Sequence, residues 1–490
     1  MEVLQRTANR GSISDGGYNI DNSIMFTTEG TYADANSLFY DIMKQSEGFA
    51  ADANAGTNAR KCTVSAWVKR TKITNSSHYD RIFSYRGGGV AFDVYFDPAT
   101  DQLTMYDDNT SMSLKTNRAF RDTSAWYHIV VAVDQTQGTA ANRVNVYVNG
   151  VQETSFATED YGNQNVDLSA FRAESISVYV GGAGHEASAY FNGYIAEYNF
   201  IDGAQLAQTE FGEFDDDSGI WKPKKFTGSY GTLGHYYNFT VANDMGKDFS
   251  GNGNDSNNRG DGIANGAARQ ATDTPTNNFC TFNPLMDQGN SPTISDGATK
   301  STGGGSNWNQ TWGSIGVKNG KWYYEMKVTN TSSTGYIGAS TTPAVSDYTN
   351  TVQLMYNTSF MLGQASRIDY YYWQSGSQVS NESTGWGTIS TNDIIGIALD
   401  LDSSTKKFIV YKNGSALNGS GTDLPTNMQN EFIFPLYVQY ENRADEINLG
   451  GYTTMTISSA ASDGNGYGTF EIAPPSGYYA LCTKNLAEFG

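Results

Sequence analysis

Hydrophobic and polar residues alternate along much of the first half of the chain. At positions 64–69, valine and alanine alternate with serine, tryptophan and lysine, and the same period of two recurs at 129–133 and 144–148. This period predicts strands with one face on a core and the other toward solvent or a partner. The third segment runs into Asn149-Gly150, the dipeptide that type I′ turns prefer, so an antiparallel hairpin is predicted there.

The same pattern continues at 176–180 and 194–201, and it resumes in the second half of the chain. There, residues 318–328 place Trp, Tyr, Met and Val on one strand face directly after an Asn-Gly turn. Five further strand-like segments follow, at 335–340, 393–402, 406–414, 434–438 and 447–450. The pattern predicts an all-β chain with two antiparallel β-sandwich domains of the jelly-roll kind.

Residues 206–300, between the two predicted sandwiches, contain turn after turn of Gly, Asn and Asp. This stretch also carries too many aromatic rings for a free linker of low hydrophobicity. We therefore expect an ordered connector whose rings pack onto both modules. The rings expected to do so are those of Trp221, Phe226, Tyr230, Tyr236 and Tyr237.

The predicted domain boundaries follow from these changes of pattern. We expect an N-terminal arm at 1–20, the first sandwich at 21–205, the connector at 206–300 and the second sandwich at 301–490. Within the first sandwich, the polar stretch 31–60 is an insertion, and its segment 35–45 has the pattern of a short helix.

Two series of motifs resemble known sandwich families. SAWVKR at 65–70, RIFSYR at 81–86, WYHIVVAVD at 126–134, VNVYVNG at 144–150 and YVGG at 179–182 follow the order of a laminin G or concanavalin A-like jelly roll. In the second half, the series from KNGKWYYEMKV at 318–328 to INLG at 447–450 resembles a SPRY domain. The resemblance implies a lectin-like module followed by a recognition scaffold.

The stretch 191–230 carries a further resemblance. It contains GYIAEYNFIDG at 193–203 and WKPKKFTG at 221–228, and it is followed by DFSGNGND at 248–255 and PPSGYYALCTKNL at 474–486. Together these motifs resemble a family of marine bacteriophage virion proteins, of cyanophage and pelagiphage type, that pair a lectin-like sandwich with a second sandwich. The resemblance implies a structural protein of a virus particle, present as a homo-oligomer or in multiple copies, with other capsid or tail proteins as partners.

Composition limits which classes of partner, and which cellular compartment, are expected for the protein. The 490 residues include 31 Lys and Arg against 51 Asp and Glu, for a net charge of −20, so neither nucleic acid nor a membrane is expected as a partner. Cys62, Cys280 and Cys482 lie far apart without zinc-like spacing and are expected to be small core residues. The N-terminus lacks the apolar segment of a signal peptide, which fits a phage protein made in the host cytoplasm and assembled into virions.

Catalytic groups are sparse in the sequence. Some concanavalin A-like glycosidases carry Glu-x-Asp-x-x-Glu, because two carboxylates must flank the glycosidic oxygen. The nearest string here, Glu213-Phe214-Asp215, lacks the second glutamate and lies in a turn-like context, so we expect a solvated acidic turn. The four histidines are scattered, and no nucleophile elbow, zincin or P-loop motif is present. We therefore expect a protein that is not an enzyme.

Two short features of the sequence bear on ligand binding, one aspartate and one tripeptide. Laminin G-like sandwiches often hold calcium with loop aspartates, and Asp134 ends a predicted strand where such a ligand could lie. No other cofactor is indicated. The Arg-Gly-Asp tripeptide within 258–262 is a chance occurrence in a chain so rich in Gly, Asn and Asp.

Aromatic residues make up 13% of the chain, including 32 Tyr and 8 Trp, and they are the remaining functional signal. Such rings suit protein interfaces and sugar rings alike, and many simply fill cores. The run Tyr370, Tyr371, Tyr372 and Trp373 must point alternate rings to opposite faces of a strand. Two of the four can be core, and we expect the other two to lie at an interface or a glycan site.

Three functional hypotheses from different classes result. The first is a non-enzymatic virion structural protein, either a capsid decoration or knob or a tail appendage that presents lectin-like modules to the host. The second is a glycan-binding tail-fibre adhesin, whose repeated copies supply avidity. The third and weakest is a glycosidase or depolymerase.

Overall fold

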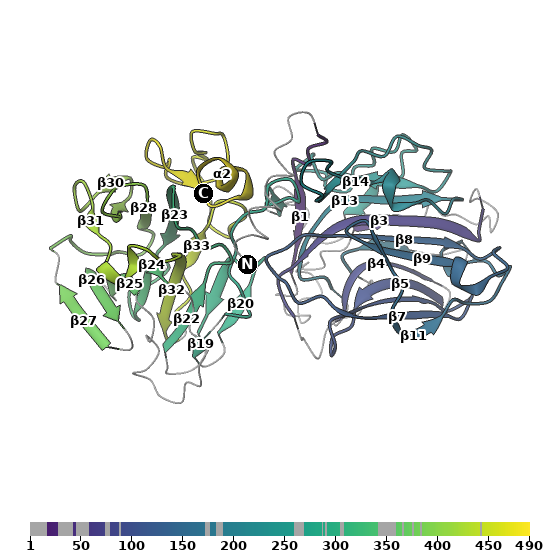
Figure 1. Cartoon of the computed structure of the whole chain (residues 1–490), viewed down its shortest axis with the longest axis horizontal. Helices are drawn as coiled ribbons and strands as arrows, with labels where there is room; N and C mark the ends of the chain where they lie inside the picture. Colours follow the sequence, from purple (N-terminus) through teal and green to yellow (C-terminus); the bar gives the residue numbers. More distant parts are fainter. Residues whose placement is uncertain are drawn as a thin grey trace. The chain divides into compact units, whose positions relative to one another are not determined.

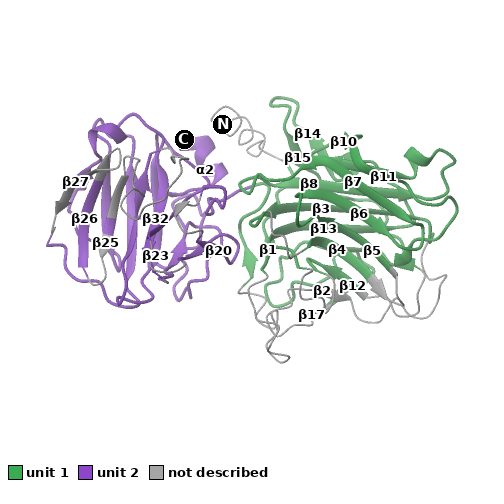
Figure 2. Ribbon diagram, turned by 90° about the horizontal axis from the view of Figure 1, so that it is seen from below, with its two compact units in different colours: residues 1–276 green, residues 277–490 purple. Residues whose placement is uncertain are grey.

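The alternating segments form the strands of four large sheets in the computed structural model of the chain (Figure 1). The structure describes residues 17–27, 43–45, 58–73, 79–87, 90–171, 177–182, 190–258, 269–286, 288–289, 292–303, 308–341, 359–364, 367–374, 377–382, 385–441 and 443–490. The chain divides into two compact units, Met1–Thr276 and Asn277–Gly490 (Figure 2).

The first unit is a sandwich of two antiparallel sheets. The first sheet runs β10 (Val151–Glu153), β9 (Val144–Val148), β8 (Tyr127–Asp134), β3 (Lys61–Arg70), β13 (Gly193–Asp202), β1 (Ser23–Phe26) and β18 (Gln270–Ala271), with β16 (His235–Tyr237) also paired to β13. The second runs β11 (Phe156–Asp160), β7 (Met112–Ala119), β6 (Gln102–Asp107), β5 (Val90–Phe96), β4 (Asp80–Gly87), β12 (Ser177–Val180), β2 (Met43–Gln45) and β17 (Ser256–Asn258).

The core of this unit lies between the two sheets. Phe83 and Phe92 of the second sheet and Tyr198 of the first meet there, with ring centroids 5.3 and 6.5 Å from that of Phe83. The predicted hairpin joins β9 to β10, and both turn residues have positive φ, 49° at Asn149 and 78° at Gly150. Positive φ at both positions is the type I′ geometry that the dipeptide predicts.

The structure divides the predicted connector, residues 206–300, between the two units. Strands β16 and β18 extend the first sheet and β17 extends the second, whereas β20 (Thr293–Ser295) and β21 (Lys300–Thr302) belong to the second unit. Among the described residues of the stretch, the hairpin of β14 (Gly212–Phe214) and β15 (Trp221–Pro223) is the one sheet that it forms by itself. Its strands complete the edges of the sandwiches on either side.

The second unit is also a two-sheet sandwich. One sheet runs β19 (Gln288–Gly289), β22 (Trp308–Trp312), β32 (Phe434–Tyr440), β24 (Gly335–Ser340), β25 (Ser359–Gln364), β26 (Arg367–Gln374) and β27 (Ser377–Glu382). The other runs β20, β21, β33 (Glu446–Asn448), β23 (Lys321–Lys327), β28 (Ile394–Asp400), β29 (Lys407–Lys412) and β30 (Ser415–Ala416), with β31 (Thr422–Asp423) on β29 and β34 (Tyr479–Ala480) parallel to β23. Trp322, Tyr324, Met326 and Val328, which the sequence places on one strand face, are core residues.

Helices are few among the described residues. Helix α2 (Thr483–Phe489) follows β34, and the other helical segments there are single 3₁₀ turns. Of the segment predicted as a short helix, 35–45, the last three residues form β2, and the rest lies outside the described residues. No helix of the described chain is both long and apolar enough to cross a membrane.

Candidate functional site

The outward face of the first sheet of the first unit is covered rather than open. On β3, Trp67 is 5% exposed and Lys69 is completely buried, although the alternation predicted that this face meets solvent or a partner. Residues 204–250, which we call the covering segment, lie against it. Phe211, Phe226, Tyr230 and Tyr236 of the covering segment form a second apolar cluster with Val130 and Ile201 of the sheet.

Trp221 anchors the covering segment to the middle of this face. Its Nε1 donates a hydrogen bond to Nδ1 of His128 at 2.9 Å, and the His128 ring stacks on Trp67 with centroids 4.6 Å apart. Because Nδ1 accepts, Nε2 of the neutral ring carries the proton and donates to Oγ of Ser65 at 2.8 Å. Burial lowers the pKa of His128 to about 3, so the ring is a neutral structural group rather than an acid or base.

A buried carboxyl group lies beside this cluster, at a bulge in β13. The register with β3 shifts between Ala196 and Asn199, and Glu197 has a φ of 49°. Oε1 of Glu197 accepts hydrogen bonds from Tyr18 at 2.7 Å and Tyr236 at 2.8 Å, and the two hydroxyl oxygens are 2.9 Å apart. Burial is the largest cause that raises the pKa of Glu197, to about 7.

The two tyrosine hydroxyls oppose that rise in pKa, because hydrogen bonds donated to the carboxyl oxygen stabilise its ionised form. Burial of the carboxyl group outweighs them.

Asp273 fixes the last residues of the first unit to the same face. Its side chain accepts from Nζ of Lys69 at 2.7 Å and from Nε1 of Trp126 at 3.0 Å, and its backbone oxygen accepts from Oγ of Ser23. The side chains of Lys69 and Asp273 are both fully buried. Because each buried charge has its partner, the pair is a structural anchor.

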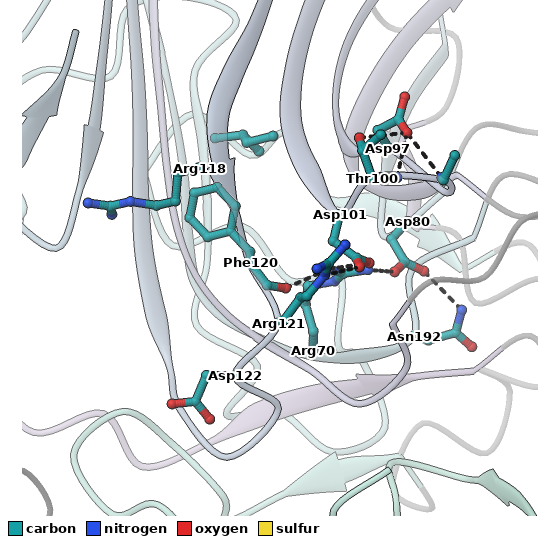
Figure 3. A network of polar contacts seen from close by, with 12 residues as sticks. Arg70, Asp80, Asp97, Thr100, Asp101, Arg118, Phe120, Arg121, Asp122 and Asn192 are labelled. Carbon is teal, nitrogen blue, oxygen red and sulfur yellow. Dashed lines mark hydrogen bonds and ion pairs between the residues drawn. The ribbon is translucent and has the colours of Figure 1, made fainter. Parts of the chain in front are cut away.

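A second buried ionic network surrounds Arg70 (Figure 3). Its guanidinium donates to Asp80 at 2.7 Å and to the backbone oxygen of Phe120 at 2.7 Å, and it lies 3.1 Å from Asp101. Asn192 donates to the other oxygen of Asp80 at 3.0 Å, as the figure also shows. Burial raises the pKa of Asp80, and the nearby Arg70 opposes that rise. The carboxylates are thus engaged with protein groups, which favours a structural role.

The acidic turn predicted from the sequence forms the hairpin of β14 and β15. Asp215 accepts hydrogen bonds from the backbone and hydroxyl of Ser218, which are the largest cause lowering its pKa to about 2. Lys222 lies 3.4 Å from Glu213 and 3.3 Å from Asp215. The two acids are therefore a hydrogen-bonded, lysine-paired turn.

The five aromatic residues predicted to order the connector are all buried. Trp221, Phe226, Tyr230 and Tyr236 lie on the covered outer face, whereas Tyr237 joins the core between the sheets. Tyr230 also donates a hydrogen bond to Asn199 of β13 at 2.8 Å. These rings contact strands of the first unit.

Asp134, the predicted calcium ligand, makes hydrogen bonds with both carboxylate oxygens. One accepts from the backbone and hydroxyl of Thr136, and the other from Gln137 at 2.8 Å, with Lys61 at 3.0 Å. Burial opposes the shift, but these contacts lower the pKa of Asp134 to about 2. Within the described ranges, no three His, Cys, Asp or Glu side chains gather as metal ligands.

The run from Tyr370 to Trp373 lies in β26 and alternates as strand geometry requires. Tyr370 stacks on Phe408 at 5.6 Å in the core and Tyr372 packs against the same core, whereas Tyr371 points to the opposite face and packs edge-on against Tyr336. The side chain of Trp373 lies outside the described residues, as do Arg-Gly-Asp at 259–261, His78 and His185. All three cysteines are buried thiols, and no disulfide bond joins them.

A partly exposed face occurs on the second sheet of the first unit, whose central strands β4, β5 and β6 lie side by side in Figure 2. Tyr79 and Tyr106 are exposed on it, whereas Arg81, Ser84, Asp93 and Thr104 are buried. Two rows of outward side chains cross it. The first row is Arg81, Tyr95, Thr104 and Lys115, and the second is Ser84, Asp93, Tyr106 and Ser113, each residue directly opposite the next. Tyr79 packs edge-on against Tyr95 at 5.3 Å. We call Tyr79, Tyr95, Tyr106 and the polar side chains of these rows the tyrosine face.

Sequence reasoning missed both Glu197 and the tyrosine face. Ile195, Tyr198 and Phe200 all face the core, and the interval of three between the first two was the available signal for a bulge. The outward position of Tyr95 could be read from alternation with Val94 and Phe96. Its proximity to Tyr79 and Arg81 depends on the register between β4 and β5, which alternation does not specify.

A comparison with known protein families supports the predicted fold of the first sandwich. Residues 45–209, less than half of the chain, match the family model described as the concanavalin A-like lectin/glucanases superfamily, of laminin G type. No curated protein matches the chain. The all-β class with two antiparallel sandwiches, predicted from the sequence, is confirmed, and the first unit contains a concanavalin A-like domain.

Several solved structures are similar to parts of the chain. The SPRY domain of human HERC1 has 16% identity and a TM-score of 0.26, covering 34% of this chain and 96% of that one. Domain 4 of AbnA, an arabinanase from Geobacillus stearothermophilus solved with arabinotriose, has 19% identity and a TM-score of 0.22, covering 30% and 63%. A pentraxin from Limulus polyphemus has 16% identity and a TM-score of 0.25, covering 39% and 80%.

Proposed function

We propose that the chain is a non-enzymatic structural protein of a phage virion, which presents a lectin-like module on a capsid decoration, knob or tail appendage. The observation that carries the proposal is the structural role of the stretch 191–230, the part that resembles phage virion proteins. Its aromatic rings seal one face of a sandwich, and its acids form a turn paired with Lys222. This arrangement suits a durable part of a particle.

Antibody labelling of intact particles tests the virion role. We expect an antibody against the first unit to decorate purified particles, and electron microscopy to locate the label on the capsid or the tail. Particles that carry no label, while the same antibody detects the protein in infected-cell lysate, would refute the proposal.

A glycan-binding adhesin is the second candidate function, supported by the match of residues 45–209 to a lectin and glucanase superfamily. Many copies on one particle would add avidity to weak individual sites. A glycosidase is the weaker alternative. Its test is the pair Glu213→Gln and Asp215→Asn, which we expect to leave any polysaccharide-directed activity unchanged; loss of cleavage in these variants would contradict a non-enzymatic role.

A further inference from the structure

The tyrosine face combines exposed rings with fixed polar groups. Tyr79 and Tyr106 are 39% and 37% exposed, and they are the two tyrosines among the exposed large hydrophobic side chains of the described residues. Tyr95, half-buried between them, is the direct neighbour of Arg81 and Thr104 in its row. Tyr106 lies diagonally from Tyr95 on the adjacent strand, a spacing of about 7–8 Å in antiparallel sheets.

The rings are held in place before any ligand arrives. The guanidinium of Arg81 lies 5.3 Å from the ring centre of Tyr79 and 5.7 Å from that of Tyr95, and its Nε lies 3.6 Å from Asp93. Tyr106 donates a hydrogen bond to Asp108. Side chains fixed in this way lose little conformational entropy on binding, which favours affinity from a small contact area.

The rings lie among polar groups, of which Arg81, Asp93 and Thr104 are buried and Asp97, Ser113 and Lys115 are half-buried. Exposed rings beside partly accessible polar groups fit a sugar better than an apolar protein surface. Each row places a tyrosine between polar side chains: Tyr95 between Arg81 and Thr104, and Tyr106 between Asp93 and Ser113. A pyranose has the matching amphipathic form, with C–H groups on its faces and hydroxyls around its edge. The hydroxyl oxygen of Thr104 is buried without a hydrogen-bond partner, and Lys115 and Asp97 are half-buried beside it.

The charges of the face favour a neutral sugar. Arg81 is paired with Asp93, and Lys115 with Asp97 at 2.8 Å, so no cation of these rows is left over for an anionic group. The net charge of −20 on the whole chain also repels anionic polysaccharides.

We propose that the tyrosine face binds neutral pyranose oligosaccharides by stacking their rings on Tyr79, Tyr95 and Tyr106. The proposal deepens the second candidate function, and it does not depend on the location of the protein on a particle. Particle labelling and sugar binding can therefore fail separately.

The test is a titration of the full chain, followed by NMR or calorimetry, with β-1,4-glucan, β-1,3-glucan and β-1,4-galactan hexasaccharides and with dextran sulfate. We expect at least one neutral hexasaccharide to bind with a Kd of about 1 mM or tighter. Removing both exposed rings, as Tyr79→Ala with Tyr106→Ala, should weaken binding about tenfold or more. Tyr106→Phe keeps the ring and should retain binding.

Phe249→Ala is the matched control, because Phe249 is 42% exposed but belongs to the covering segment of the other sheet. It should leave the Kd unchanged, and thermal unfolding checks that each variant is folded. No binding of any neutral hexasaccharide at about 10 mM, binding of dextran sulfate alone, or unchanged binding in the double variant would each overturn the proposal. The first of these results, together with loss of the double variant from particles, would instead identify the face as a protein interface.

Discussion

The carboxyl group of Glu197 keeps its proton near neutral pH, and the sequence around it does not predict this. It lies on a covered face, in a backbone conformation that residues other than glycine rarely adopt, and its two hydrogen-bond donors are hydroxyls rather than cations. Its pKa of about 7, against 4.5 for an ordinary glutamate, follows from that burial. The folded state therefore keeps a proton that the unfolded chain releases.

This residue predicts a pH dependence of stability. The contribution of Glu197 is fully present below pH 4.5 and is lost as pH rises through about 7. By linkage, it amounts to up to about 3 kcal/mol. Glu197→Gln should remove this dependence, so the variant should gain stability relative to the natural chain between pH 5 and pH 8. Hydrogen exchange of β3 and β13 amides at both pH values measures the difference, and an equal effect of the substitution at both would contradict it.

Burial also raises the pKa of Glu325 in the second unit to about 7, and its carboxyl group accepts hydrogen bonds from several donors that oppose the rise. They are the backbone of Glu471 and Ile472, the amide of Asn448 and the hydroxyl of Tyr323. Glu325→Gln would turn an amide NH₂ toward two of these donors. We expect a loss of about 1–3 kcal/mol at pH 8, measured by chemical denaturation. A neutral or stabilising effect would show that the donors can find other acceptors.

At the scale of the element, the sequence predicts the strands but not what packs against their outward face. The alternation of β3 predicts which residues enter the core, and Val64 and Val68 do so. It does not show what lies over Trp67 and Lys69, because the covering segment is more than a hundred residues away in sequence. The edges of the sheets were missed for the same reason: β16 and β18 are short strands in a turn-rich stretch whose pairing depends on distant partners.

The turn between β9 and β10 lies against Trp221 of the covering segment. A Cβ atom added at Gly150 would lie 2.2 Å from the ring of Trp221, so Gly150→Ala should push Trp221 away from His128. Gly219→Ala is the matched control, because Gly219 also has positive φ but open space around it. Both substitutions strain the backbone. Gly150→Ala should lower the free energy of unfolding by about 1–3 kcal/mol more than Gly219→Ala does, as measured by urea denaturation.

A second substitution sharpens this test. In a Trp221→Ala background the collision is absent, so the extra cost of Gly150→Ala should largely disappear. If the two glycine variants lose equal stability in the natural background, Trp221 does not constrain the turn.

For the whole molecule, the two compact units predict where the chain can be divided. Cutting after Thr276 should yield a folded first unit, because Asp273 and Thr276 remain bonded to Lys69 and Ile20. Ending the chain at residue 205, where the sequence pattern suggests that the sandwich ends, should instead expose Val130, Ile201 and Trp67. We expect residues 1–205 to aggregate and residues 1–276 to remain monodisperse in gel filtration, and equal behaviour of the two fragments would contradict a required cover.

The attachment of Asp273 also has a mechanical consequence. A force applied along the backbone at Asn277 first meets Thr276, which is bonded to Ile20, and then Asp273, four residues before Asn277. There the load passes through Lys69 and Trp126 into β3 and toward β8, the middle of a sheet, and through Ser23 into β1. Because β3 and β8 are held by strands on both sides, we expect tension at this end of the first unit to be carried by the sheet before it reaches the covering segment.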